Sequence, residues 1–223
     1  TGISLTASSF DENINANSTI AVLASTDADA TDSHTYSLIN GTGDTDNNAF
    51  IIDGSSLKII ASPDYETKSS YNIRLKTLDS GGKNFDNSFT LLVNNLNDSP
   101  TDIVLDSNQF NENINSYTTV STLSTIDQDD SDTHIYSLVN GVGDSDNSFF
   151  TIDGNQLKIK ASPDYETKSS YNIRLKTTDA AGESIEKAFT LSVNDLNDIP
   201  TAIALSSASF NENIAGGSTV AIL

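Results

Sequence analysis

Cysteine, methionine and tryptophan are absent from this sequence of 223 residues, and histidine occurs only twice. Without Cys the chain has no disulfide framework, zinc–thiolate site, iron–sulfur cluster or thiol nucleophile. Two His leave few nitrogen ligands for zinc or copper. His34 and His134 occupy equivalent positions at the start of a predicted strand, and we interpret both as structural or merely exposed residues.

Basic residues are also scarce. Lys and Arg number 11 against 31 Asp and Glu, which gives a formal net charge of −20. A nucleic-acid-binding protein needs Lys and Arg to replace the counterions of phosphate, and a protein drawn to anionic lipid needs them as well. The charge therefore excludes nucleic acid as a partner and points to cations or to high solubility.

Long apolar runs are missing. No stretch approaches the roughly 20 apolar residues that cross a bilayer, so we expect no membrane insertion by this segment. No signal peptide opens the chain and no Met begins it, so we expect a segment of a larger secreted or membrane-anchored protein. The abundance of Asn, Ser, Thr and Asp, with few Lys and no Cys, favours an extracellular or cell-surface location.

The strongest positive signal is internal repetition. Residues 61–77 and 161–177 both read ASPDYETKSSYNIRLKT. The same offset of 100 residues relates FDENI at 10–14 to FNENI at 110–114, and again to FNENI at 210–214. The chain is therefore built from two full units and the beginning of a third.

Each unit is predicted to be all-β. Short segments rich in Ile, Val, Tyr, Phe and Thr are separated by clusters of Gly, Asn, Asp and Ser. Tyr71, Ile73, Leu75 and Thr77 alternate with polar residues, so one face of that strand is buried and the other is wet. The strands expected in the first unit are 3–6, 19–24, 34–39, 49–53, 57–60, 71–78 and 87–94. This pattern predicts tandem seven-stranded Greek-key β-sandwiches.

The predicted domains are 1–99, 100–199 and a truncated start of a third repeat at 200–223. The boundary at Asn95 to Pro100 is short and polar, because proline removes an amide donor and holds the preceding residue extended. The truncated repeat is too short to complete a sandwich, and we expect it to supply only a first strand or two.

Acidic residues recur at fixed positions. Asp64 and Glu66 stand two residues apart, as do Asp127 and Asp129. An extended chain sends side chains i and i+2 to the same side, and two like charges held there repel unless a cation lies between them. Ca²⁺ accepts roughly six to eight oxygen ligands in flexible geometry, whereas Mg²⁺ demands a tighter octahedron with more water. The spacing therefore favours calcium.

These motifs resemble those of the cadherin-type repeat, in the bacterial cadherin-like form that occurs in tandem in large surface adhesins. Asn111-Glu112-Asn113 resembles its glutamate motif, Asp64-Tyr65-Glu66 its D-x-E motif, Asp127-Gln128-Asp129 its D-x-D motif, Asp179 its late aspartate, and Asp195-Leu196-Asn197-Asp198 its D-x-N-D linker. The resemblance covers both full units and the truncated one. It implies cadherin-like, immunoglobulin-like sandwiches with Ca²⁺ at the joints between repeats.

The resemblance also implies the calcium ligands. At the first joint they are Glu12, Asp64, Glu66, Asn95, Asn97, Asp98, Asp127, Asp129 and Asp179. At the second joint the lower half consists of Glu112, Asp164, Glu166, Asp195, Asn197 and Asp198, and the acids of the upper half would follow Leu223. The free start of the first unit offers Asp27, Asp29 and Asp79 without a preceding linker. One complete calcium cluster and two partial ones are predicted.

Three departures from the family pattern bear on these ligands. Ser99 and Ile199 stand where Asn is usual. The stretch after the D-x-D motif lacks the usual Gly-x-Asn, and Asp132 is a candidate substitute ligand there. Asn95 replaces the first acid of the linker, which the second linker keeps as Asp195. We therefore expect the first joint to bind calcium more weakly than the second.

We interpret the chain as non-enzymatic: calcium-binding repeats of an extracellular adhesin, in which Ca²⁺ at the joints rigidifies a rod for cell adhesion. Like chains or other cell-surface molecules are the expected macromolecular partners. Two alternatives stay open. One is a carbohydrate-binding β-sandwich module of a secreted enzyme, which needs a platform of exposed aromatic residues. The other is a set of non-adhesive spacer repeats.

Overall fold

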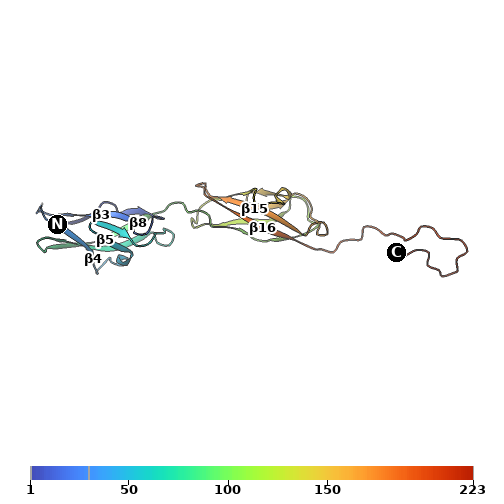
Figure 1. The fold of residues 1–223 in the computed structure, drawn as a ribbon, viewed down its shortest axis with the longest axis horizontal. Coiled ribbons are helices and arrows are strands. Elements are labelled where there is room, and N and C mark those ends of the chain that lie inside the picture. Colours follow the sequence, from blue (N-terminus) through green and yellow to red (C-terminus); the bar gives the residue numbers. More distant parts are fainter. Residues whose placement is uncertain (1, 30, 223) are drawn as a thin grey trace. The chain divides into compact units, whose positions relative to one another are not determined.

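The computed structural model describes residues 2–29 and 31–222. The chain forms two compact units. Unit 1 comprises Thr1–Thr101, Ile126–Thr133 and Asp179–Ser184, and unit 2 comprises Asp102–Thr125, His134–Thr178 and Ile185–Leu223. Each unit is built around one β-sandwich (Figure 1). The two tandem sandwiches confirm the predicted all-β fold class.

The first sandwich is made from two four-stranded sheets, ordered β1-β3-β6-β5 and β2-β8-β7-β4. Its strands are β1 (Gly2–Leu5), β2 (Ser9–Asp11), β3 (Thr19–Thr26), β4 (His34–Leu38), β5 (Phe50–Asp53), β6 (Ser56–Ile59), β7 (Ser70–Asp79) and β8 (Asn84–Asn94). Neighbouring strands are antiparallel except β2 and β8, which run parallel with Phe10 opposite Val93.

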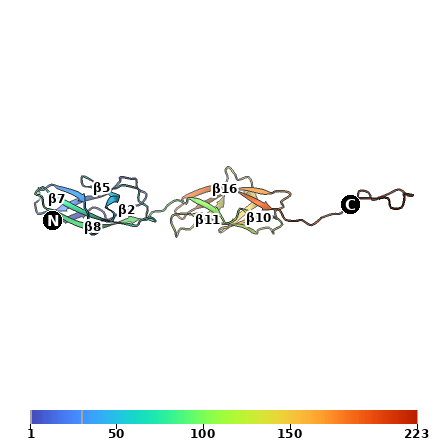
Figure 2. The ribbon, with the colours of Figure 1, turned by 90° about the horizontal axis from the view of Figure 1, so that it is seen from below.

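The second sandwich repeats this topology, with sheets ordered β9-β11-β14-β13 and β10-β16-β15-β12 (Figure 2). Its strands are β9 (Asp102–Leu105), β10 (Gln109–Asn111), β11 (Thr119–Ile126), β12 (Ile135–Leu138), β13 (Phe150–Asp153), β14 (Gln156–Ile159), β15 (Ser170–Thr178) and β16 (Ser184–Asn194). Single-turn 3-10 segments, Asn47–Ala49 and Asn147–Phe149, precede β5 and β13. Nowhere in 2–29 or 31–222 is there a helix long and apolar enough to cross a membrane.

The core of each sandwich follows from the alternation of apolar and polar residues. On β7, Ile73, Leu75 and Thr77 are buried, as expected for the inward face of the strand. The hydroxyl of Thr77 is not stranded in the core, because its Oγ1 lies 2.7 Å from the Oγ of Ser25. At the other end of β7, the ring of Tyr71 packs edge-on against Phe50 with centroids 5.3 Å apart. Strand β7 thus has the buried face and the solvent-facing side that its alternating sequence predicts.

The beginning of each repeat differs in detail from the predicted strand pattern. The chain pairs first with one sheet through β1 and then crosses to the other through β2, so each sandwich has eight strand segments. Strand β2 has only three residues, of which Phe10 alone is buried. Such a segment is too short for its alternation to be recognised in the sequence.

The prediction that residues 200–223 supply a strand or two is wrong over the described part, residues 200–222, which contains no strand (Figure 1). Local contacts of the repeat nevertheless form there. The amide of Ser206 donates to the carbonyl of Ile222 at 2.9 Å, as Thr6 does to Val22 at 3.0 Å. Ile203 is 85% exposed, whereas its equivalent Ile103 is fully buried. The segment therefore keeps the local bonds of the repeat without its core.

Candidate metal centre

The centre of the first acidic cluster is Glu12, which follows β2 directly and is almost fully buried. Both oxygens of its carboxylate accept backbone hydrogen bonds: Oε2 from the amide of Tyr65 at 2.6 Å and Oε1 from the amide of Leu96 at 2.7 Å. Glu12 therefore ties the D-x-E segment and the linker to the end of β2. Ligand oxygens of Glu12, Asp64 and Glu66 all lie within 4.8 Å of one another.

Linker side chains and two loops of unit 1 join this cluster. The amide of Asp98 donates to Oδ2 of Asp129 at 2.7 Å, and Nδ2 of Asn97 donates to Oδ2 of Asp179 at 2.9 Å. Nδ2 of Asn95 donates to Oε1 of Glu66 at 2.9 Å. Asp127 accepts from the amide of Asp129 at 3.1 Å. All nine residues predicted for the first joint belong to unit 1.

The carboxylates of this cluster respond to one another electrostatically. The pKa of Glu66 is raised above its ordinary value of 4.5, chiefly by desolvation and also by the negative charges of Glu12, Asp129 and Asp98. The pKa of Asp179 is lowered, chiefly by the hydrogen bond from Asn97. The pKa of Asp64 is lowered as well, mainly by the amide of Thr67. Desolvation and neighbouring negative charge both disfavour the ionised form of Glu66, and both effects are relieved when a cation binds beside it.

Open space adjoins the crowded carboxylates. A cavity of about 390 Å³ is lined by Tyr65, Glu66, Ser69, Asn95, Asp129, Asp130 and Ser131. A second, of about 260 Å³, is lined by Asn95, Leu96, Asn97, Asp129, Ser131 and Asp132. Asn95 and Asp129 line both cavities, so the side-chain oxygens of these two proposed ligands adjoin space that an ion could occupy. This donor set, carboxylates with amide and backbone oxygens, matches what Ca²⁺ accepts.

A smaller cluster of the same kind lies in unit 2. Ligand oxygens of Glu112, Glu166 and Asp198 lie within 4.8 Å of one another. Glu112 is buried and accepts from the amides of Tyr165 at 2.8 Å and Leu196 at 2.6 Å, as Glu12 does in unit 1. A backbone hydrogen bond is the largest effect on the pKa of Glu166 and lowers it, but desolvation with the charges of Glu112, Asp198 and Asp195 raises it overall.

The other predicted residues of this half-site are placed less closely. Asp164 accepts from the amide and hydroxyl of Thr167, at 3.1 and 2.9 Å. Nδ2 of Asn197 donates to the carbonyl of Asp198 at 3.2 Å. Among the contacts described, Asp195 influences Glu166 only through its negative charge, which raises the pKa of Glu166.

Three residues that position the ligands of the two clusters were not predicted to do so. Nδ2 of Asn13 donates to Oδ1 of Asp98 at 2.9 Å, and Asn113 does the same for Asp198 at 2.9 Å. Asn13 and Asn113 both have φ of 59°, a left-handed conformation that Asn tolerates. Nε2 of Gln128 donates to Oδ2 of Asp64 at 2.8 Å. The repeated Asn beside the glutamate motif was the available signal for Asn13, whereas Gln128 is not repeated and gave none.

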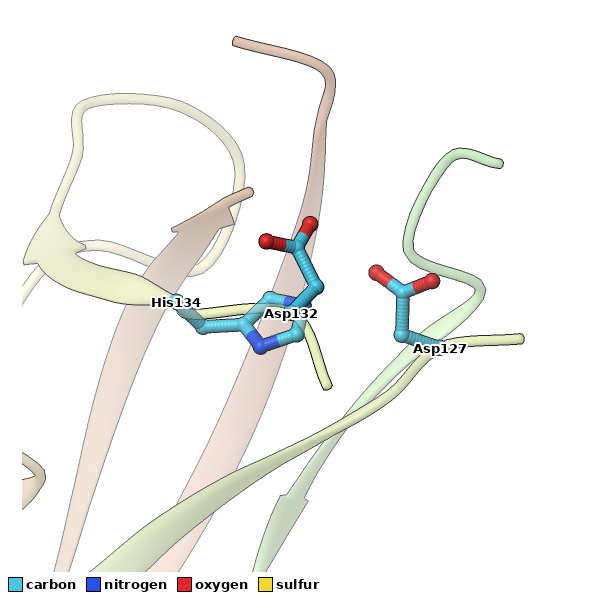
Figure 3. Close-up of side chains that lie close together, drawn as sticks. All are labelled: Asp127, Asp132 and His134. Atoms are coloured by element: carbon cyan, nitrogen blue, oxygen red, sulfur yellow. The ribbon is translucent and has the colours of Figure 1, made fainter. Parts of the chain in front are cut away.

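The loop before β12 brings a third group together. Ligand atoms of Asp127, Asp132 and His134 lie within 4.8 Å of one another, and Figure 3 draws these three side chains. All three side chains are partly buried. The sequence indicated Asp132 as a substitute ligand, but it did not indicate that His134 lies with it.

Two tandem β-sandwiches of this topology, with an acidic cluster at the linker, define the class of cadherin-like domains. No protein-family model matches the chain. The sequence is 28% identical to protocadherin Fat 4 of Mus musculus over 221 residues, which are 95% of this chain and 4% of that protein. It is 31% identical to cadherin-4 of Caenorhabditis elegans over 134 residues, 58% of this chain and 3% of that protein. The chain thus spans a small fraction of the curated relatives it matches.

Among solved structures, human protocadherin-24 EC1-2 in crystal form II superposes with a TM-score of 0.67 at 19% identity, covering 87% of this chain and 99% of that one. The two sandwiches are therefore similar in sequence to repeats of these cadherins and share the fold of protocadherin extracellular repeats. Such repeats form extracellular regions of larger proteins. Cadherins are a non-enzymatic adhesion family, which agrees with the prediction that the chain is not an enzyme.

Proposed function

We propose that the first acidic cluster binds Ca²⁺. The proposed ligands are Glu12, Asp64, Glu66, Asn95, Asn97, Asp98, Asp127, Asp129 and Asp179. The observation that carries the proposal is the gathering of carboxylates from separate segments around the linker, where Asp98 contacts Asp129 and Asn97 contacts Asp179. Desolvation and the neighbouring carboxylates raise the pKa of Glu66, and a cation that neutralises the cluster stabilises the ionised form.

We further propose that Glu112, Asp164, Glu166, Asp195, Asn197 and Asp198 form half of a second calcium site. Its clustered members, Glu112, Glu166 and Asp198, all lie in unit 2. The domain limits 1–99, 100–199 and 200–223 are part of the same proposal, because each acidic linker then closes one repeat.

The proposed role is mechanical. Without Ca²⁺ the carboxylates repel and the linker flexes; with Ca²⁺ the ligands share ions, and the free energy of metal binding orders the linker. The rigid array serves an adhesin at the cell surface, with like chains or other surface molecules as partners in homophilic or heterophilic adhesion. Membrane anchorage would come from elsewhere in the larger protein, and the bacterial form of the repeat stays a prediction.

Calcium titration calorimetry of Asp98→Ala tests the calcium site. Asp98 contributes its carboxylate and a backbone contact to Asp129, so we expect the affinity of the first cluster to fall about tenfold or more, the scale seen when metal ligation is disturbed. Asp53→Ala is the matched control, because it removes the same charge from an exposed residue paired with Lys58. Unchanged affinity in Asp98→Ala, or an equal loss in Asp53→Ala, contradicts the proposal.

The spacer alternative predicts the same calcium binding without adhesion. Beads coated with the chain should aggregate when calcium is added and disperse when it is chelated if the repeats bind like chains. Beads that stay dispersed in both conditions favour a spacer, and a soluble-sugar pull-down tests the carbohydrate-binding alternative.

A further inference from the structure

The second sandwich exposes aromatic rings at two positions where the first sandwich has smaller residues. Phe149 is 42% exposed and Tyr117 is 62% exposed. The equivalent residues of the first repeat are Ala49 and Asn17. Calcium takes oxygen ligands from carboxylates, amides and carbonyls, so the proposed calcium sites make no use of either ring. Large apolar side chains that gather on a surface mark a place where a ligand or a partner binds.

A cavity of about 340 Å³ adjoins Phe149 and lies within unit 2 alone. Its walls include Phe149, Tyr171, Ile159, Ser162, Thr167 and Lys168. The volume falls in the range of small-molecule sites, roughly 300–1,000 Å³. Every lining residue except Phe149 recurs 100 residues earlier in the first repeat. The aromatic ring of Phe149 is therefore what distinguishes this wall from its counterpart.

The ring of Phe149 is held in place by its neighbours. It packs against Tyr171 with centroids 5.4 Å apart, and Tyr171 packs edge-on against the buried Phe150 at the same distance. Nζ of Lys168 lies 5.9 Å from the centroid of Phe149 and 3.0 Å from Oδ1 of Asp146. A ring fixed in this way offers a preformed apolar surface, so a ligand loses little free energy in ordering it.

Tyr117 has an unfavourable backbone conformation beside the same cavity. Its φ is 62°, in the left-handed region that bulky residues rarely adopt, whereas the equivalent Asn17 has φ of 63° and tolerates it. The amide of Tyr117 donates to the carbonyl of Ile159 at 2.6 Å, and Ile159 lines the cavity. A strained and exposed aromatic residue next to a cavity is an outlier that points to function.

The cavity combines an aromatic wall with a polar edge. Ser162 and Thr167 are exposed and bring hydroxyl groups, which both donate and accept hydrogen bonds. A pyranose ring is complementary to such a site, because its C–H groups form apolar faces and its hydroxyl groups lie at the rim. The one positive charge among the lining residues, on Lys168, is already paired with Asp146. The net charge of −20 therefore repels an anionic ligand and favours a neutral one.

We propose that this cavity binds a neutral sugar ring, which stacks on Phe149. The sugar hydroxyl groups bond to the hydroxyls of Ser162 and Thr167 and to the ammonium group of Lys168. Asp164 also lines the cavity, but it belongs to the calcium proposal and has no part in this one. The proposal goes beyond rigidity, because it assigns a glycan as a partner of the second repeat. It differs from a carbohydrate-binding module of an enzyme, because the repeat keeps its proposed calcium sites.

The test is a ¹H–¹⁵N NMR titration of the whole chain with cellohexaose, maltohexaose and mannohexaose, and with hexagalacturonate as an anionic comparison. We expect a neutral oligosaccharide to shift the amide signals of Phe149 and its neighbours. Phe149→Ala should weaken that binding about tenfold, because the stacked ring is lost. Phe85→Ala is the matched control and should bind as the wild type does, because it removes a phenylalanine that is 37% exposed on the first sandwich.

Tyr117→Asn provides a second readout, because it restores the residue of the first repeat. It should weaken sugar binding while raising the free energy of unfolding, since Asn tolerates the left-handed backbone. A loss of binding that accompanies a gain in stability is the opposite of what misfolding produces. Urea unfolding of each variant measures the stability.

No shift with any of the three neutral oligosaccharides would overturn the proposal and leave the cavity to an apolar side chain of a protein partner. Equal binding of hexagalacturonate, unchanged binding in Phe149→Ala or an equal loss in Phe85→Ala would overturn it too. Calcium calorimetry of Phe149→Ala should match the wild type, and sugar binding should persist in chelator. Failure of this proposal and failure of the calcium proposal therefore give different results.

Discussion

At the scale of single residues, Glu12 organises the cluster before any ion binds. Each of its oxygens accepts one backbone amide, from Tyr65 and from Leu96, and the side chain is almost fully buried. A buried carboxylate held in this way positions the neighbouring ligands by fixing two segments at once. It is therefore a structural residue as well as a proposed ligand.

Glu12→Gln should destabilise the first sandwich by about 1–3 kcal/mol in the absence of metal. Glutamine keeps the shape but turns an NH₂ group towards one of the two amides, which leaves that buried donor unsatisfied. Urea unfolding in the presence of a chelator measures the loss.

Glu66→Gln serves as the comparison, because Glu66 is exposed and its pKa is raised by desolvation and by the negative charges of its neighbours. Removing that charge should leave the metal-free stability unchanged or slightly increased. A Glu12→Gln variant as stable as the wild type would show that the two amides do not depend on the carboxylate.

The sequence predicted the clustered carboxylates better than the residues that hold them. Asp64 and Glu66 could be placed on one side because extended chain fixes the direction of residues i and i+2. The hydrogen bond from Gln128 to Asp64 depends on the folded positions of segments 64 residues apart, which no local pattern encodes. The closeness of His134 to Asp127 and Asp132 was missed for a different reason, because it depends on the shape of one loop, which strand alternation does not reveal.

At the scale of elements, long strands were predictable and short ones were not. Strand β7 shows a clear alternation over ten residues, whereas β2 has three residues and is defined by its parallel pairing with β8. In the glycine-containing loop before β5, Gly41 donates its amide to Oδ2 of Asp44 at 2.9 Å. Contacts with other strands decide how much the free energy of unfolding falls when a glycine is replaced.

Gly43→Ala should lower the free energy of unfolding more than Gly54→Ala does. Both glycines have positive φ, of 85° and 61°, so both variants carry a left-handed backbone cost of about 1–2 kcal/mol. A Cβ at Gly43 would also lie 2.7 Å from Cβ of Ser88, whereas nothing lies within 4 Å of one at Gly54. Overpacking should add about 1–3 kcal/mol at Gly43. Equal losses in urea unfolding would show that the loop yields freely.

At the scale of the whole molecule, the proposed function predicts that calcium at the first cluster makes the first linker rigid and that calcium at the second cluster does not. Asp98 and Asp198 are held alike, each by an Asn side chain at 2.9 Å. Only Asp98 contacts a loop that follows β11, through its amide and Oδ2 of Asp129. The two aspartates therefore form a matched pair: both accept a hydrogen bond from an Asn side chain, but only Asp98 also contacts Asp129.

Small-angle scattering of Asp98→Ala and Asp198→Ala, with calcium and with chelator, separates these roles. The wild type should show a narrower distribution of interatomic distances with calcium than with chelator, because bound ions order the linker. Asp98→Ala should resemble the chelated wild type in both conditions, whereas Asp198→Ala should respond as the wild type does. When the free calcium concentration is 100 times the dissociation constant of a site, binding at that site should also raise the free energy of unfolding by about 2.7 kcal/mol. Wild-type profiles that are identical with and without chelator would remove the mechanical role, even if calorimetry detects calcium, because binding would then leave the linker as it was.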